Sequence, residues 1–321
     1  MQSWTKSKKA SDSIPTLTTT DGLLLLDKPS GPGSAEMVGR ARRATGIKRI
    51  GHTGTLDRFA SGLLVLVVGR ATVLADEILR FDKSYDALFR AGRFTDTHDP
   101  SGQTVDERTA EECAEFLSSD AERFAPWFAD QIGRQQQLPP HYSAIKHQGR
   151  RLSDRMRKGL EVELKPRTVE IFESSMDQPE SDEHGFFIRC HFTVSSGTYI
   201  RSLVRDFSQS MGFPFYLESL RRTRVGPFSV EDAWVPPESR NLEFDAAVAE
   251  RILDVRQAFP DWPAYLLDVN RAAAIEQGRK IPVPLPEADG QNFFLLRPDE
   301  SVVAIARRDG AGYGFRKVFA R

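Results

Sequence analysis

The stretch Gly51-His52-Thr53-Gly54-Thr55-Leu56-Asp57, followed by Ala60-Ser61-Gly62 and an apolar run over 63–68, says most about how this chain folds. Its first two glycines can adopt backbone angles with positive φ that other residues avoid, which indicates a tight loop of fixed path. The apolar run indicates a buried strand directly after the loop. The loop carries one carboxylate, Asp57, and catalytic side chains often lie on loops that a rigid scaffold holds. An ordinary turn residue is the alternative interpretation of an isolated Asp, so the rest of the sequence has to decide.

Around this stretch, the spacing of apolar residues predicts short strands mixed with helices. Period-two alternation and short apolar runs predict strands at 22–29, where a turn at the proline ends the strand, and at 63–68, 85–94, 168–172, 186–194, 293–297 and 301–307. A helix is expected after Ser34, its candidate N-cap, and Gly46 ends it. Helical spacing predicts further helices at 72–81, 199–211, 244–259 and 270–277. Thr109 and Glu112 form a capping-box pattern that starts another.

The order of these elements predicts the fold class. Strands and helices do not alternate regularly, and alternating strands dominate. The sequence therefore predicts an α/β protein with a mixed, largely antiparallel sheet and flanking helices, plus a small C-terminal module that is mostly β. We expect a disordered, Ser-, Thr- and Lys-rich tail over 1–21, a main domain over 22–240 with a basic insertion at about 133–160, and a small domain over 241–321.

Charge is balanced overall but unevenly distributed. The formal net charge is −1, which by itself argues against a nucleic-acid partner. From Arg40 to Arg58, however, there are six basic residues and one acidic residue, and from Lys146 to Arg167 there are eight and three. Arg221, Arg222 and Arg224 form a third cluster. Such clusters are typical of proteins that bind a phosphate backbone, although each one alone is more often a solvated surface.

Several function classes find no support in the sequence. No apolar stretch approaches the length of about 20 residues that a membrane helix needs, and the N-terminus lacks the apolar core of a secretory signal. The histidines and cysteines show no metal-ligand spacing, and neither a phosphate-binding glycine loop nor a serine-nucleophile motif occurs. We therefore expect no metal and no cofactor. Cys113 and Cys190, far apart in the sequence, fit a reducing cytosol, so we expect a cytoplasmic protein.

Seven short motifs in a fixed order link the chain to a known family. They are Gly22–Pro29 (GLLLLDKP), Gly51–Asp57 with Ala60–Gly62, Lys83–Tyr85 (KSY), Asp96–Asp99 (DTHD), Pro139–Lys146 (PPHYSAIK), Gly197–Arg201 (GTYIR) and Leu220–Arg224 (LRRTR). Each motif alone is weak evidence, but seven in order are specific, because chance would have to supply the spacing as well. From about Gly22 to Phe228 the chain closely resembles the bacterial tRNA pseudouridine-55 synthases of the TruB type.

The resemblance implies a sheet of the pseudouridine synthase type, a reaction, and the residues that perform it. The family isomerises one uridine in the T-loop of tRNA: the N-glycosidic bond breaks, the uracil turns, and C5 joins C1′. Asp57 matches the family's catalytic aspartate, and Arg201 matches the arginine that pairs with it. An adjacent guanidinium favours the charged form of a carboxylate. Tyr85 matches the active-site tyrosine, which can stack on uracil and take part in proton removal at C5.

Five further residues match positions that hold the substrate or support the site. Lys28 and Pro29 belong to a motif that buttresses the site, His52 helps to fill the space that the flipped base leaves, and Tyr199 and Leu220 line the uracil pocket. Without the resemblance, packing or surface exposure would explain these residues as well.

The chain departs from the family directly after Asp57. It has Arg58-Phe59 where the family usually has Pro-Leu. The departure removes no proposed catalytic group, but Arg58 adds a positive charge that could pair with Asp57 or with a phosphate.

The resemblance also sets expectations about partners. We expect tRNA, through its T-loop and stem, to be the substrate, with the basic insertion and the helix from Ala35 to Arg43 contacting phosphates. The C-terminal module resembles the small RNA-binding module that ends many of these enzymes. We expect a monomer that needs no obligate protein partner. Two alternatives stay open: a tRNA-binding or RNA-folding protein whose catalysis is secondary or lost, and a guide-dependent synthase that works with a small RNA and partner proteins.

Overall fold

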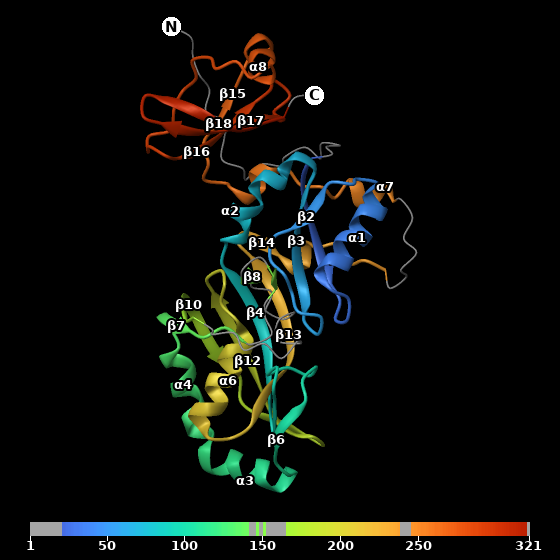
Figure 1. The fold of residues 1–321 in the computed structure, drawn as a ribbon, viewed down its shortest axis with the longest axis vertical. Helices are drawn as coiled ribbons and strands as arrows, with labels where there is room; N and C mark the ends of the chain where they lie inside the picture. Colours follow the sequence, from blue (N-terminus) through green and yellow to red (C-terminus); the bar gives the residue numbers. More distant parts are fainter. Residues whose placement is uncertain (1–20, 141–145, 148–149, 152–164, 238–244, 320–321) are drawn as a thin grey trace.

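The computed structural model describes residues 21–140, 146–147, 150–151, 165–237 and 245–319. The molecule is elongated, with one long twisted sheet and a separate small sheet at one end (Figure 1). The long sheet has the order β1 (Gly22–Lys28), β3 (Ser61–Val68), β13 (Phe215–Val225), β4 (Lys83–Ala91), β12 (Gly185–Val194), β10 (Arg167–Met176) and β7 (Gly133–Gln137). Its neighbours pair antiparallel except β13 with β3, so the expected mixed, largely antiparallel sheet is confirmed.

Short strands complete this sheet or form small hairpins beside it. The additions to the sheet are β2 (Ile50–His52) on β3, β11 (Glu180–Asp182) on β12 and β14 (Phe228–Ser229) on β13. The hairpins are β5 (Arg93–Thr95) with β6 (Thr104–Glu107) and β8 (Lys146–His147) with β9 (Arg150–Arg151).

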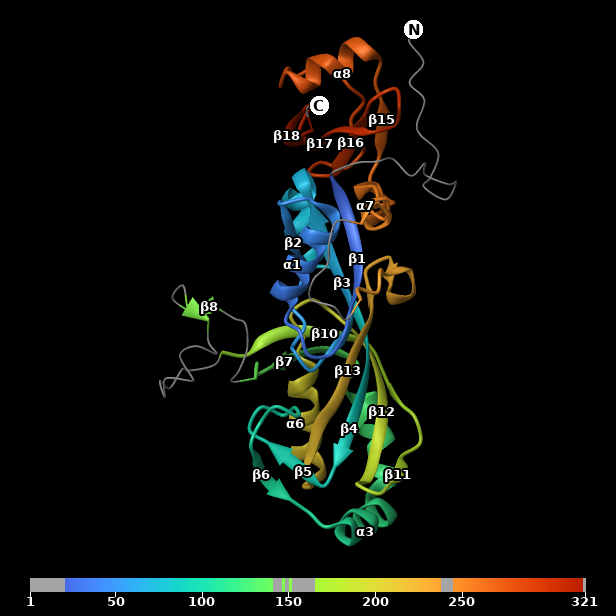
Figure 2. The same cartoon turned by 90° about the vertical axis from the view of Figure 1, so that its right-hand side faces the viewer.

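Helices flank the lower half of the long sheet on one face. α3 (Ala110–Asp120), α4 (Phe124–Asp130) and α6 (Ile200–Met211) lie there (Figures 1 and 2). Side chains alternate across a strand, so every second residue of β4 and β12 points toward these helices. Phe89 and Phe192 are two of them, and they share one buried cluster with Phe128 and Phe207 from the helices. The aromatic core fixes α6 against the strands.

The C-terminal module is a small sheet with one helix. It consists of β15 (Ala264–Leu266), β16 (Asn292–Leu296), β17 (Val302–Asp309), β18 (Gly312–Val318) and α8 (Val269–Glu276). The module packs on the long sheet through a shared apolar cluster, in which Trp262 stacks on Phe259 at a centroid distance of 4.0 Å. Arg316 on β18 pairs with Glu77 on α2 (Ala75–Leu79). Among the described helices, none is both long and apolar enough to cross a bilayer.

The helix α1 (Ser34–Thr45) covers β1 and β3 but begins differently from the prediction. Gly33 is its N-cap residue, so the expectation that Ser34 caps the helix was wrong. The Ser34 hydroxyl instead binds the backbone of Leu56, accepting from its N–H at 3.0 Å and donating to its C=O at 3.1 Å. The side chain thus ties the helix to the loop that ends at Asp57. Gly46 ends the helix in the left-handed conformation, as expected.

The helix predicted over 244–259 was also wrong. Among the described residues there, helical structure is limited to α7 (Ala246–Ala249) and the 3₁₀ turn η4 (Val255–Ala258). Between them, Leu253 exchanges two backbone hydrogen bonds with Leu23 of β1, at 2.9 and 2.7 Å. Pairing with the sheet satisfies backbone groups that a continuous helix would have used internally.

Other differences concern element ends and strands that were not predicted, of which β13 and β18 are two of the longer ones. The helix expected over 72–81 is the 3₁₀ turn η1 (Gly69–Leu74) followed by α2, and the strand expected over 85–94 is divided by Gly92 into β4 and β5. The capping box of Thr109 and Glu112 is confirmed, and η2 (Ala121–Arg123) follows that helix, while η3 (Val230–Asp232) follows β14.

Two predicted segments fall largely outside the described residues. Of the tail expected over 1–21, the structure describes Asp21, which pairs with Arg70 at 2.6 Å. Of the basic insertion at about 133–160, the described parts are 133–140, 146–147 and 150–151.

Candidate active site

The loop that carries Asp57 is shaped by glycines and held by its neighbours. Gly54 has a φ of +113° and Gly62 a φ of +103°, values that favour glycine, whereas Gly51 lies within the strand β2. A Cβ on Gly62 would lie 2.3 Å from the backbone oxygen of Arg222. The glycine therefore also permits the close approach of β3 and β13, which places the two sides of the site together.

Lys28 fastens the backbone directly after Asp57. Its side chain is fully buried, and its ammonium donates to the carbonyl oxygens of Ala60 at 2.6 Å, Pro29 at 2.9 Å and Arg58 at 3.3 Å. Burial lowers the pKa of the Lys28 ammonium to about 8, although the nearby Asp57 favours the charged form. These three hydrogen bonds hold the backbone on either side of the loop together, which is how Lys28 would support the site.

Replacing Lys28 by Met is expected to lower the free energy of unfolding by about 2–4 kcal/mol, because three carbonyl oxygens lose their donor. The pKa of Lys28 lies below its value of 10.5 in an unfolded chain, so the unfolded state binds more protons between pH 8 and 10.5. Stability of the unmodified protein therefore rises across that window relative to the variant. Denaturant unfolding at several pH values measures the free energies of unfolding of the variant and of the unmodified protein. The exposed Lys48→Met serves as control, and equal losses in both variants would contradict the prediction.

Asp57, Arg201 and Asp99 form a charged network. Arg201 lies in the first turn of α6 and is 4% exposed. Its Nε is 2.9 Å from Oδ2 of Asp57, and its Nη1 is 3.5 Å from Oδ2 of Asp99. The guanidinium also donates to the carbonyl oxygen of Thr97 at 3.4 Å. One buried arginine thus orients two carboxylates that are far apart in the sequence.

Asp57 is the member of the network that remains accessible. Its side chain is 41% exposed, whereas that of Asp99 is 5% exposed. Withdrawal from bulk water raises the pKa of the Asp57 carboxyl above its ordinary value, Arg201 opposes this rise, and Asp99 adds to it. An accessible carboxylate of raised basicity, held by a fixed cation, can attack an electrophilic carbon or accept a proton.

A cavity of about 350 Å³ opens above this carboxylate. Asp57, Tyr85, Tyr199, Arg201 and Leu220, all predicted site residues, line it together. The size and the mixture of apolar, aromatic and charged side chains suit a planar polar ring.

The remaining predicted residues lie outside the cavity lining. Lys28 is buried behind the loop, Pro29 is exposed, and His52 lies on β2 and is half-buried. Within the described ranges, no group of His, Cys, Asp and Glu side chains could hold a metal ion.

The structure adds site residues that sequence reasoning did not select. Asp99 is held by the Thr97 hydroxyl at 2.8 Å and the N–H of Ser101 at 2.9 Å. The motif Asp96–Asp99 was the available signal, but nothing in it indicated which aspartate faces Arg201. Lys83 and Arg222 also line the cavity, although both are buried cations.

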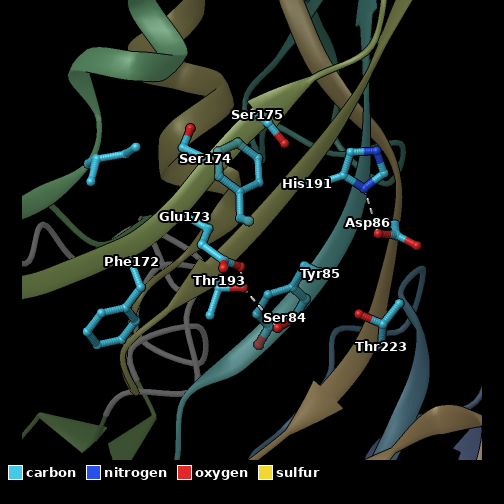
Figure 3. Close-up of a pocket in the computed structure, with 12 residues that line it drawn as sticks. Ser84, Tyr85, Asp86, Phe172, Glu173, Ser174, Ser175, His191, Thr193 and Thr223 are labelled. Atoms are coloured by element: carbon cyan, nitrogen blue, oxygen red, sulfur yellow. Dashed lines mark hydrogen bonds and ion pairs between the residues drawn. The ribbon is translucent and has the colours of Figure 1, made fainter.

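A second cavity, of about 470 Å³, is drawn in Figure 3 and has Tyr85 in its lining, as the first cavity does. Asp86 and His191 form an ion pair in it at 2.9 Å, and Glu173 accepts from the Thr193 hydroxyl at 2.6 Å. Hydrogen bonding to Asp86 raises the pKa of His191. The charged side chains that line this second cavity are mostly acidic, so the cavity repels a polyanion. Among the residues that the structure describes, no carboxylate in its lining is held by a buried arginine. The smaller cavity is therefore the better candidate.

Solved structures share this fold. A crystal structure of a Cbf5-Nop10-Gar1 complex matches with a TM-score of 0.62 and 21% identity, covering 94% of this chain and 86% of that chain. A structure of an H/ACA RNP bound to a substrate RNA containing 2′-deoxyuridine matches with a TM-score of 0.62 and 18% identity, covering 99% and 95%. Both matches extend over nearly the whole chain, so this chain has the fold of the proteins in these structures.

Sequence comparison shows to which class of enzyme and to which family the chain belongs. The model of the N-terminal domain of TruB family pseudouridylate synthases matches residues 42–200. The tRNA pseudouridine synthase B of Nitrosococcus oceani is 37% identical over 279 residues, covering 84% of this chain and 85% of that protein. The enzyme of the same name from Thermobifida fusca is 36% identical over 290 residues, covering 89% and 94%. The chain belongs to the TruB family and is an isomerase, as the seven motifs predicted.

Proposed function

We propose that this protein converts the uridine at position 55, in the T-loop of tRNA, to pseudouridine, with Asp57 as the catalytic carboxylate. The observation that carries the proposal is the accessible carboxylate of Asp57, held 2.9 Å from the buried Arg201 in a cavity of suitable size for a uracil ring. The curated relatives that it matches are named tRNA pseudouridine synthases, which supports tRNA as the substrate.

The chemistry follows from the groups in the cavity. The Asp57 carboxylate attacks C1′ or removes the proton at C2′, and in both routes the electron pair of the N1–C1′ bond leaves with the uracil. The uracil then turns and its C5 joins C1′, as the Asp57 carboxylate leaves C1′ in the first route or as C2′ regains its proton in the second. The proton on C5 is then lost and N1 gains one. Tyr85 and Leu220 line the cavity and supply the flat apolar surfaces on which the ring rests and turns.

The target base has to leave the RNA stack before it can reach Asp57. Extrusion of a stacked base costs a few kcal/mol, which contacts in the cavity and at its rim offset. We assign His52 to the space that the base vacates, and the basic segment around Arg42 and Arg43 on α1 to the phosphates. The C-terminal module adds a further RNA-binding surface in this proposal.

We further propose that the protein acts alone, as a monomer, in the cytoplasm. Its relatives carry the names of tRNA-modifying enzymes, whereas the Cbf5 structures of similar fold are complexes with other proteins. Cys113 and Cys190 are both free and buried, as expected in a reducing compartment. Activity of the purified protein on bare tRNA would exclude the guide-dependent alternative, and light scattering would report the oligomeric state.

Mass-spectrometric mapping of pseudouridine tests the proposal. An unmodified tRNA transcript is incubated with the pure protein, and a transcript with cytidine at position 55 serves as control. The proposal predicts one pseudouridine, at position 55, in the first transcript and none in the second. Tight binding of both transcripts without any product would favour the RNA-binding alternative instead.

A further inference from the structure

Two buried cations line the candidate active site without a carboxylate partner among the residues that the structure describes. Lys83 is 5% exposed and Arg222 is 1% exposed, and both side chains line the cavity that contains Asp57. In the described part of the chain, neither has an acidic group within ion-pair distance. Buried charges are normally paired, because removal from water costs several kcal/mol per ion.

The hydrogen bonds of these cations go to backbone carbonyl oxygens. The Lys83 ammonium donates to Leu79 at 2.5 Å and also to Phe81. Arg222 donates from Nε to Leu63 at 2.7 Å and from Nη2 to Gly54 at 3.2 Å. One proton of the Lys83 ammonium and the Nη1 group of Arg222 have no acceptor among the described residues. Both cations are therefore fixed in place, and both retain donors for another molecule.

The strand register places the two cations at one end of the cavity floor. Lys83 and Tyr85 are two residues apart on β4, and Leu220 and Arg222 are two apart on β13, so each pair shares a face. The strands are neighbours, with Arg222 opposite Tyr85. The floor thus combines an apolar and aromatic part with a cationic end, facing Asp57 on its loop.

We propose that Lys83 and Arg222 bind the uracil carbonyl oxygens and stabilise the negative charge that the ring acquires when its bond to the ribose breaks. The inference rests on the proposed function. As the N1–C1′ bond breaks, its electron pair passes to N1 and spreads onto O2 and O4, and no other reactant is needed. Fixed donors in a dry cavity stabilise such a developing anion more than water does. The charge disappears when C5 bonds to C1′ and N1 is protonated.

The flat and apolar side chains beside Lys83 and Arg222 favour a uracil ring over a phosphate as the anion that these two cations bind. Tyr85 and Leu220 occupy the floor next to the cations, and a phosphate there would lose hydration without gaining further donors. The two anions predict different kinetics. A phosphate contact would weaken RNA binding when the cation is removed, whereas stabilisation of the leaving uracil changes the rate of the chemical step.

The test compares Lys83→Met and Lys83→Arg with the unmodified protein in single-turnover assays. We expect Lys83→Met to lower the rate constant about 100-fold with little change in the Kd for tRNA, and Lys83→Arg to stay within about tenfold of the unmodified rate. Arg80→Met is the matched control, because this exposed arginine lies three residues earlier.

The pH profile separates this role from a structural one. Burial and, to a smaller extent, Arg222 across the strands lower the pKa of Lys83 to about 8, with Asp82 opposing both. The rate should therefore fall as the pH rises through about 8, since the charged form is the active one. In Lys83→Arg this fall should become smaller, because the guanidinium stays charged while Lys28, whose pKa is also lowered to about 8, still loses its proton there.

Three outcomes would overturn the inference. They are an unchanged rate in Lys83→Met, a loss confined to the Kd, and an alkaline fall in Lys83→Arg that is as large as that of the unmodified protein. Should Lys83→Met fail to fold, the profile of Lys83→Arg still decides. Failure of the proposed function looks different, because the unmodified protein would then form no pseudouridine at any pH.

Discussion

Replacing Asp57 by Asn lowers the single-turnover rate of pseudouridine formation by about 10⁴-fold or more, with the Kd for tRNA nearly unchanged. The amide has nearly the same shape as the carboxylate but is neither a nucleophile nor a base. The Arg201 guanidinium, 2.9 Å away in the unmodified protein, then faces an uncharged group. Rapid quenching with quantification of pseudouridine at position 55 gives the rate, and filter binding gives the Kd.

The matched control is Asp86→Asn, since Asp86 lies on β4 next to Tyr85 but in the larger, acidic cavity. This variant should keep a rate within about threefold of the unmodified protein, as expected for a surface substitution away from the chemistry. A loss in Asp86→Asn as large as that in Asp57→Asn would move the active site to the cavity of Figure 3.

Arg201→Gln is expected to lower the rate by about 10²- to 10³-fold. Arg201 is the cation that contacts both Asp57 and Asp99, so its loss leaves two neighbouring carboxylates without their shared positive charge. The pKa of Asp57 is already above its ordinary value, and loss of the group that lowers it raises it further. The acid side of the pH–rate profile should therefore shift to higher pH in this variant.

Arg205→Gln is the control for Arg201→Gln. Arg205 lies one turn further along α6, where it pairs with its neighbour Asp206 at 2.7 Å. Its loss should change neither the rate nor the acid limb. A pH–rate profile of Arg201→Gln that superimposes on that of the unmodified protein would show that the guanidinium does not act on Asp57.

The sequence predicted those parts of the fold whose pattern is local. Alternation from Phe186 to Val194 predicted β12, and the helical face from Ile200 to Met211 predicted α6, because each buries one face of its own residues. β13 was missed since its arginines look like a solvated surface. In the structure Arg222 is among the most buried side chains, and its Nε and Nη2 donate to carbonyl oxygens of β3 and of the Asp57 loop. Hydrogen bonds to groups that are far away in the sequence leave no pattern in the residues around Arg222.

The candidate site could be predicted only through the family resemblance. Asp57, Tyr85 and Arg201 come from a loop, a strand and a helix that nothing in the spacing brings together, and the structure gathers them around one cavity. The resemblance did not indicate Asp99 as a partner of Arg201, because that contact depends on how the turn before β6 folds over α6. His52 and Pro29 match the family but lie outside the cavity lining, so their roles stay predictions.

A crystal structure of Asp57→Asn bound to the T-arm of tRNA tests the central claim most directly. The account predicts that uridine 55 is flipped into the cavity lined by Tyr85 and Leu220, with its C1′ within about 3.5 Å of the substituted side chain at position 57. A uridine that stays stacked in the RNA loop, or that occupies the cavity of Asp86 and His191, would contradict it.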